Sequence, residues 1–131
     1  MDPVYILLVE DDQDDIELLL TAFKDAQIPF HMDSVMQGDA VIPFLTTRSR
    51  QPDVIVLDLN MPGIHGREVL QLLKASGTLQ NIPVVMLTTS SSLADLEFCK
   101  KAGAEAFLTK PLTVAGFHSI TQAIFTVAAG N

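Results

Sequence analysis

Cysteine is nearly absent from the sequence, which has only Cys99 among its 131 residues. One cysteine cannot form an internal disulfide or a multi-cysteine zinc site, so a reducing compartment fits and a disulfide-built secreted domain is excluded. Basic residues are also scarce, since 8 Lys and Arg stand against 16 Asp and Glu, for a net charge of −8. This balance argues against nucleic-acid binding through a broad basic face and is compatible with a site for a divalent cation.

Long apolar segments are missing as well. The first apolar run, Val4–Val9, follows Met1-Asp2-Pro3 without a basic flank, so it is neither a signal peptide nor a membrane span. We therefore expect a cytoplasmic protein that does not associate with membranes. With 131 residues, of which 48% are hydrophobic and 18% charged, the chain is expected to form one compact domain, without an output domain.

Short apolar runs alternate with helical patterns along the whole chain. Strands are predicted at 4–9, 30–36, 54–57, 83–87 and 106–108, and helices at 13–26, 66–75 and 92–102 and after Thr113. A turn at Gly38-Asp39 is expected to precede a further helix reaching about Thr47, short or irregular because Pro43 is tolerated only in or near the first turn. Asp12, Gly38-Asp39 and Ser92 with Asp95 are the expected N-terminal caps of three of these helices. Neighbouring parallel strands need helical crossover connections. The alternation of strands and helices therefore predicts an α/β domain with helices on both faces of a parallel sheet.

Asp58 ends the most apolar of these runs, Val54-Ile55-Val56-Leu57. A short run without polar alternation suits a strand buried on both faces, which would place Asp58 at the carboxyl end of a central strand. Open α/β sheets bind their ligands at such ends. Alternatively, Asp58 starts a solvated turn before Met61-Pro62, and the run alone leaves both interpretations open.

Polar residues follow the carboxyl ends of the first, third, fourth and fifth predicted strands. They are Glu10, Asp11 and Asp12 after the first strand, Asn60 after the third, Thr88 and Thr89 after the fourth, and Lys110 after the fifth. Because the carboxyl ends of parallel strands share one edge of a sheet, we expect these residues to meet Asp58 in one shallow site.

Such a set of side chains suits metal binding and phosphoryl transfer. Mg²⁺ or Mn²⁺ binds carboxylate oxygens and would relieve the repulsion between them. A carboxylate such as Asp58 can attack phosphorus and form an aspartyl phosphate. Lys110 and the hydroxyl of Thr88 could then hold the charged phosphoryl oxygens.

These residues resemble the signature of the receiver domains of two-component response regulators. The resemblance rests on Glu10-Asp11, on Asp58 within Leu57-Asp58-Leu59-Asn60-Met61-Pro62, on Thr88 and on Lys110-Pro111, in the family's order and spacing. It covers essentially the whole chain. It implies a flavodoxin-like (βα)₅ fold with strand order 2-1-3-4-5 and phosphorylation of an Asp by a sensor histidine kinase.

The same resemblance implies a role for each residue. Asp58 would be the phosphoacceptor, with Lys110 and Thr88 as its phosphoryl contacts, and Thr88 and Phe107 would form the switch. The metal ligands would be Asp11, Asp58, the backbone carbonyl of Asn60 and, through water, Glu10. Asp12 is better explained as a cap, and a core aromatic would look the same as Phe107. In this family the peptide bond before the residue matching Pro111 is often cis.

Two short segments, Thr88-Thr89-Ser90 and Gly66-Arg67-Glu68-Val69-Leu70, resemble single-domain regulators that partner phytochrome-type histidine kinases. The implied partners are such a kinase, a histidine phosphotransfer protein and a second copy of the chain. Thr89 departs from the Ala or Gly of many receivers, and its larger side chain is expected to narrow access to Asp58.

Several other functions compete with this one. A flavodoxin-like electron carrier would need a Ser/Thr/Gly-rich phosphate loop where Glu10-Asp11-Asp12 stands. A haloacid-dehalogenase-like phosphatase needs a second Asp at the position of Asn60, so we expect self-phosphorylation and slow autodephosphorylation, without rapid turnover. A pseudo-receiver that only binds partners, and a phosphorelay or phosphate-sink intermediate, remain as alternatives.

Overall fold

The computed structural model describes residues 2–61 and 64–130, and within them five parallel strands form one sheet. The strands are β1 (Val4–Val9), β2 (Phe30–Val35), β3 (Val54–Leu57), β4 (Val84–Thr88) and β5 (Ala106–Thr109). Their order in the sheet is β2-β1-β3-β4-β5, with every neighbouring pair parallel. The flavodoxin-like fold that the resemblance implied is therefore confirmed.

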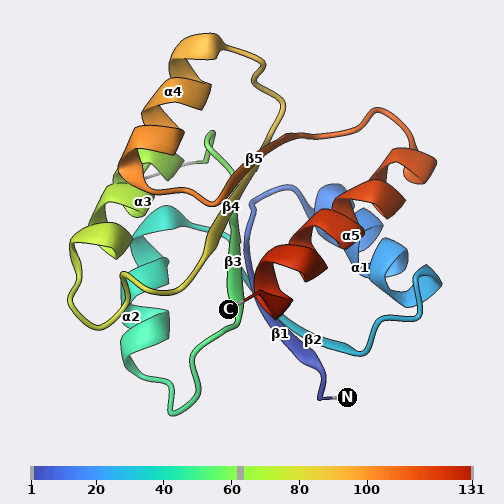
Figure 1. Ribbon diagram of the computed structural model, residues 1–131, viewed down its shortest axis with the longest axis horizontal. Coiled ribbons are helices and arrows are strands. Elements are labelled where there is room, and N and C mark those ends of the chain that lie inside the picture. Colours follow the sequence, from blue (N-terminus) through green and yellow to red (C-terminus); the bar gives the residue numbers. More distant parts are fainter. Residues whose placement is uncertain (1, 62–63, 131) are drawn as a thin grey trace.

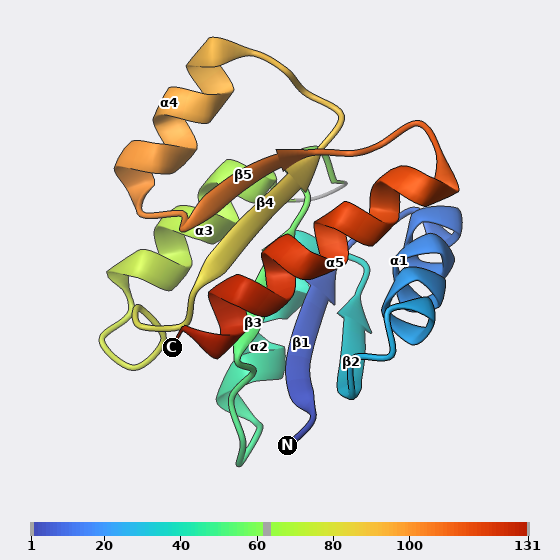
Figure 2. The same cartoon turned by 45° about the vertical axis from the view of Figure 1, so that its right-hand side comes forward.

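Helices cover both faces of the sheet (Figures 1 and 2). One face carries α1 (Gln13–Asp25) and α5 (Val114–Ala129), which also pack against each other. The other face carries η1 (Gly38–Ala40), α2 (Val41–Thr46), α3 (Gly66–Ala75) and α4 (Leu93–Ala102). No helix within the described ranges is long and apolar enough to cross a membrane.

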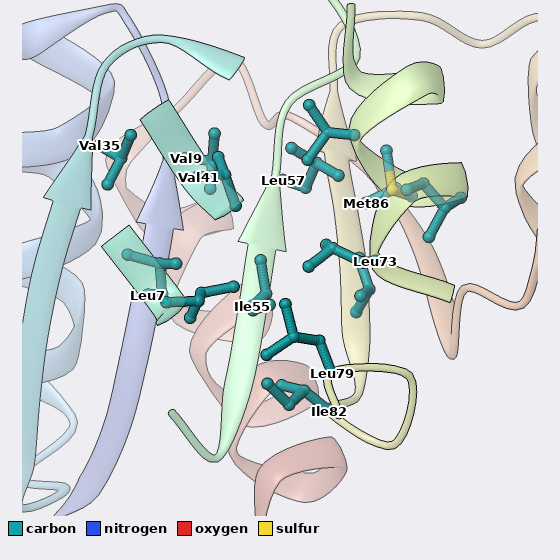
Figure 3. Close-up of a cluster of buried hydrophobic side chains, with 14 of the residues drawn as sticks. Leu7, Val9, Val35, Val41, Ile55, Leu57, Leu73, Leu79, Ile82 and Met86 are labelled. Carbon is teal, nitrogen blue, oxygen red and sulfur yellow. The ribbon is translucent and has the colours of Figure 1, made fainter. Parts of the chain in front are cut away.

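The core consists of two layers because successive strand residues point to opposite faces. In β3, Ile55 and Leu57 pack beneath α2 and α3, and Figure 3 shows them next to Leu73 of α3. Val54 and Val56 of the same strand belong to the layer beneath α1 and α5. β3 is buried along its whole length, as its continuous apolar run predicted.

The predicted turn at Gly38-Asp39 and the short helix after it are both present. A 3₁₀ turn, Gly38–Ala40, precedes α2, in which Pro43 is the third residue. Asp39 lies inside that turn and does not cap the helix, contrary to the prediction. A Cβ atom on Gly38 would lie 2.3 Å from the carbonyl oxygen of Ile64, so glycine is needed at this close approach.

The helices α1 and α5 begin at side-chain caps, and α4 ends at a glycine. Asp12 Oδ1 accepts a hydrogen bond from the Asp14 amide at 2.9 Å, and Thr113 Oγ1 accepts one from the Gly116 amide at 3.1 Å. Gly103 ends α4 with a φ of 106°, in the left-handed region that glycine tolerates.

The carboxyl ends of the strands are aligned at one edge of the sheet. Val9 is opposite both Val35 and Leu57 in the registers of β1, so Glu10 and Asp58 emerge side by side. No cis peptide bond occurs among the described residues, so the bond before Pro111 is trans, the isomer that X-Pro bonds favour by about 0.5–1 kcal/mol. The turn expected at Pro62 and Gly63 lies outside the described residues.

Candidate active site

Two buried carboxylates follow the central strands directly. Glu10 is 2% exposed and Asp58 is 6% exposed, whereas the neighbouring Asp11 is exposed. The sheet pairing continues into both residues, because the Glu10 amide donates to Val35 at 3.0 Å and the Asp58 amide donates to Val9 at 3.1 Å. The backbone of the site is therefore as rigid as the sheet itself.

Glu10, Asp11 and Asp58 form an acidic cluster that fits a hard cation. One carboxylate oxygen from each residue lies within 4.8 Å of the others, in the part of the chain that the structure describes. A purely oxygen donor set suits Mg²⁺ or Mn²⁺ better than a soft metal. Asn60, whose backbone carbonyl was expected to bind the metal, is exposed beside the cluster. Its backbone amide donates to Asp58 Oδ1 at 3.2 Å.

Lys110 brings a positive charge into this acidic site. Its Nζ atom lies 2.6 Å from Glu10 Oε1, 2.8 Å from Asp15 Oδ2 and 3.2 Å from Asp58 Oδ2. Its side chain is only 9% exposed, so these pairs are shielded from water. The meeting of Lys110 with Glu10 and Asp58 was predicted, but the contact with Asp15 was not.

Burial and neighbouring charges shift the pKa values of two of these groups. Burial raises the pKa of the Glu10 carboxyl to about 7, with Asp58 adding to the rise and Lys110 opposing it. For Lys110, burial acts to lower the pKa, but the hydrogen bonds to Asp15 and Glu10 and the charge of Asp58 outweigh it and raise the pKa. The ammonium is therefore charged at neutral pH.

Thr88 is the fully buried last residue of β4. Its carbonyl oxygen accepts a hydrogen bond from the Lys110 amide at 2.7 Å, which ties the ends of β4 and β5 together. Its hydroxyl oxygen accepts one from the Ser90 amide at 3.2 Å. Thr89, in between, is exposed.

A polar chain leads from Thr88 into the interface between α3 and α4. Ser90 Oγ donates to Asp95 Oδ2 at 2.6 Å, and Arg67 of α3 forms an ion pair with Asp95. The Arg67 guanidinium also lies 4.7 Å from the centre of the Phe98 ring. Arg67, Asp95 and Phe98 line a cavity of about 360 Å³ that reaches Asn60.

Asp95 was predicted to complete a capping box with Ser92, and only half of that box forms. Ser92 Oγ accepts from the Asp95 amide at 3.3 Å, as expected. The Asp95 carboxylate turns away towards Ser90 and Arg67, because a charged partner from α3 is a stronger one than a backbone amide. The hydrogen bond from Ser90, together with Arg67, holds the pKa of Asp95 below its ordinary value.

Phe107, the predicted switch residue, lies on β5 opposite Met86 of β4. Its half-buried side chain packs against the core layer that includes Cys99 of α4, and it borders a cavity of about 210 Å³ with Leu96. Phe107 therefore lies where a movement of α4 would change its surroundings. Its switching role stays a prediction.

Sequence reasoning missed two participants of the site, Asp15 and Arg67. Asp15 lies in the first turn of the helix after β1 and was explained by the helix dipole alone. The available signal was its position in the first helical turn after β1, near the carboxyl end of that strand. For Arg67, which reaches Asp95 across 28 residues, the sequence held no comparable signal.

The sequence matches the family model of the response regulator receiver domain over residues 6–122. It is 35% identical over 127 residues to the response regulator Rcp1 of Synechocystis sp. strain PCC 6803, covering 93% of this chain and 86% of Rcp1.

Two solved structures are similar in both sequence and fold. The phosphorylated cyanobacterial phytochrome response regulator RcpA superposes with a TM-score of 0.86 at 32% identity, covering 94% of this chain and 91% of that one. The Mn²⁺-bound form of Rcp1 superposes with a TM-score of 0.84 at 34% identity, covering 95% and 93% of the two chains.

Proposed function

Since the chain belongs to the response regulator receiver family, we propose that it is a phosphorylation-dependent switch in which Asp58 accepts a phosphoryl group from a sensor histidine kinase. The observation that carries the proposal is the placement of Asp58. Its buried carboxylate lies between an acidic cluster that fits a cation and the ammonium of Lys110. The expected cytoplasmic location belongs to the same proposal.

In the reaction, a phosphoryl group passes from a histidine of the kinase to Asp58 and is bonded covalently to each in turn. An Asp58 carboxylate oxygen attacks phosphorus, an O–P bond forms, and the P–N bond of the kinase phosphohistidine breaks. The histidine leaves as imidazole after taking a proton, and Asp58 becomes an acyl phosphate. Lys110 donates to the phosphoryl oxygens from its place beside Asp58, at 3.2 Å in this structure.

Glu10, Asp11, Asp58 and the carbonyl of Asn60 are the groups that would hold Mg²⁺ or Mn²⁺. When bound, the metal would neutralise charge on the transferred phosphoryl group. The Mn²⁺-bound form of Rcp1, at 34% identity, supports this choice of ions.

The switch would begin at Thr88. Its carbonyl oxygen accepts from the Lys110 amide, and turning its hydroxyl towards a phosphoryl oxygen would break the hydrogen bond of that hydroxyl with the Ser90 amide. Such a turn shifts a pre-existing equilibrium of the loop before α4. The surface of α4, β5 and α5 is the expected readout, and it exposes Leu93 (73%) and Leu96 (38%) to partners.

A groove next to the site supports a helical kinase partner. It lies between α1 and the start of α5, has a volume of about 390 Å³, and is lined in part by Leu18, Thr21 and Val114. The fully exposed Leu112 follows Lys110 on the same side. A phytochrome-type kinase is the specific partner we propose, because Rcp1 and RcpA are the similar proteins.

Intact-mass measurement tests the proposal. The protein is incubated with acetyl phosphate, with and without Mg²⁺, beside Asp58→Asn and the matched surface control Asp39→Asn. We expect a Mg²⁺-dependent gain of one phosphoryl group in the wild type and in Asp39→Asn, and none in Asp58→Asn. No gain by folded wild type would favour the pseudo-receiver alternative.

The partner is tested separately. Transfer from a phosphorylated phytochrome-type kinase is compared with transfer from a kinase that has a different sensor domain. Preferential loss of phosphate from the phytochrome-type kinase supports the pathway, whereas equal transfer from both contradicts it. Passage of the group from Asp58 to a histidine phosphotransfer protein would indicate a phosphorelay intermediate.

A further inference from the structure

The ammonium group of Lys110 has three N–H donors, and three carboxylates surround it. Nζ lies 2.6 Å from Glu10, 2.8 Å from Asp15 and 3.2 Å from Asp58. Nζ donates hydrogen bonds to Asp15 and Asp58 and forms an ion pair with Glu10. A phosphoryl oxygen that contacts this ammonium therefore competes with these three carboxylates for it.

The three carboxylates differ in what phosphorylation does to them. Asp58 becomes an acyl phosphate, so the negative charge of its carboxylate is replaced by the charge of about −1.5 to −2 on the phosphoryl group. Glu10 belongs to the acidic cluster with Asp11 and Asp58, so its interactions change whenever a cation is held there. Asp15 lies outside this cluster and takes no part in the transfer. Of the three, Asp15 is therefore the partner that can hold Lys110 at every stage.

The backbone holds Asp15 in a fixed position. It is the third residue of α1, and its amide donates to the capping oxygen of Asp12 at 3.4 Å. Its carboxylate is 23% exposed, so its attraction for Lys110 is only partly screened by water.

We propose that Asp15 is a positioning residue for Lys110, which keeps the ammonium beside the phosphoryl site while Glu10 and Asp58 change partners. The inference rests on the proposed function, because it concerns the same site. Without the charge of Asp15, the ammonium moves fully onto Glu10 and Asp58. A positive charge at that position repels a cation in the acidic cluster and so weakens cation binding.

A double-mutant cycle on Mg²⁺ affinity, measured by calorimetry without any phosphodonor, tests the proposal. Asp15→Asn and Asp14→Asn are compared alone and combined with Lys110→Ala. Asp14 is the matched control, because it is the exposed neighbour in the same helical turn and its loss removes the same charge.

With Lys110 present, we expect Asp15→Asn to weaken Mg²⁺ binding about fivefold more than Asp14→Asn, the effect of one partly exposed charged hydrogen bond. With Lys110→Ala, both variants should have equal effects. Asp15→Glu keeps the charge and should restore most of the affinity. Equal effects while Lys110 is present, or a difference that persists with Lys110→Ala, would overturn the proposal.

Phosphorylation by acetyl phosphate at saturating Mg²⁺ separates this inference from the proposed function. We expect the maximal rate to fall about fivefold in Asp15→Asn and to stay unchanged in Asp14→Asn. If the wild type takes no phosphoryl group, the proposed function fails, and calorimetry still decides the role of Asp15. If the wild type is phosphorylated and Asp15→Asn behaves as Asp14→Asn in both measurements, only the positioning role is wrong.

Discussion

Gly66 packs directly against the backbone of Asp58. A Cβ atom at Gly66 would lie 2.3 Å from the Asp58 carbonyl oxygen and 2.6 Å from the Cα atom of Leu59. The Gly66 amide also donates to the Leu59 carbonyl at 2.9 Å. The first residue of α3 thus touches the segment that carries Asp58, the proposed phosphoacceptor.

Gly66→Ala is therefore expected to damage stability and phosphorylation together. The backbone atoms cannot move without shifting Asp58, so we expect a loss of about 2–3 kcal/mol in the free energy of unfolding and slower phosphoryl gain. Gly77→Ala is the control, because a Cβ atom there meets no described atom within 4 Å. Urea denaturation and intact mass measure the two effects, and a fully stable Gly66→Ala protein would contradict the packing.

The stability of the metal-free protein should fall as pH rises from about 5 to 8. The Glu10 carboxyl has a pKa of about 7 in the folded state against an ordinary value of 4.5, so in this window the folded state binds the extra proton. Raising the pH removes that proton and leaves a buried charge, which costs on the order of 2 kcal/mol. Urea denaturation in EDTA measures the slope.

Two comparisons make this pH prediction specific. Glu10→Gln cannot titrate, so its stability should be nearly independent of pH in the same window. Mg²⁺ should reverse the trend in the wild type, since a cation favours the charged form of the cluster. A wild-type slope that survives in Glu10→Gln would assign the effect to another group.

Asp95→Ala should loosen the contact between α3 and α4. The change removes the partner of both Ser90 and Arg67, and Asp95 is 22% exposed, so we expect a loss of about 1–2 kcal/mol in stability. Glu97→Ala, an exposed position on the same helix, is the control. Equal stability of the two variants in urea would contradict a structural role for the Asp95 pairs.

The native Cys99 thiol can be used to measure the opening of α4 without introducing a new residue. Its thiol is fully buried, and burial raises its pKa, so it should react with an aromatic disulfide only when α4 opens. We expect the reaction to be about 100-fold slower than in the unfolded chain and to accelerate in Asp95→Ala. Rapid labelling of the native wild type would show that α4 is mobile on its own.

Residues predicted from strand ends were brought together because a parallel sheet aligns those ends whatever the helices do. Glu10, Asp58 and Lys110 meet for that reason. Asp15 and Arg67 were missed because their partners depend on how far a long side chain reaches between elements, which local sequence does not encode. Asp39 was wrongly predicted as a helix cap, because the 3₁₀ turn runs through it to Ala40 and α2 begins only at Val41.

The position of Lys110 in the chain has a consequence for protein synthesis. Lys110 leaves the ribosome 52 residues after Asp58 and 95 residues after Asp15, although it pairs with both. Until then the nascent domain holds its clustered negative charges without their counter-charge and lacks the edge strand β5. The later segment adds the edge strand β5 and the counter-charge of Lys110 together, so a ribosome-stalled chain ending before β5 should be recognisable as an incomplete, chaperone-binding intermediate.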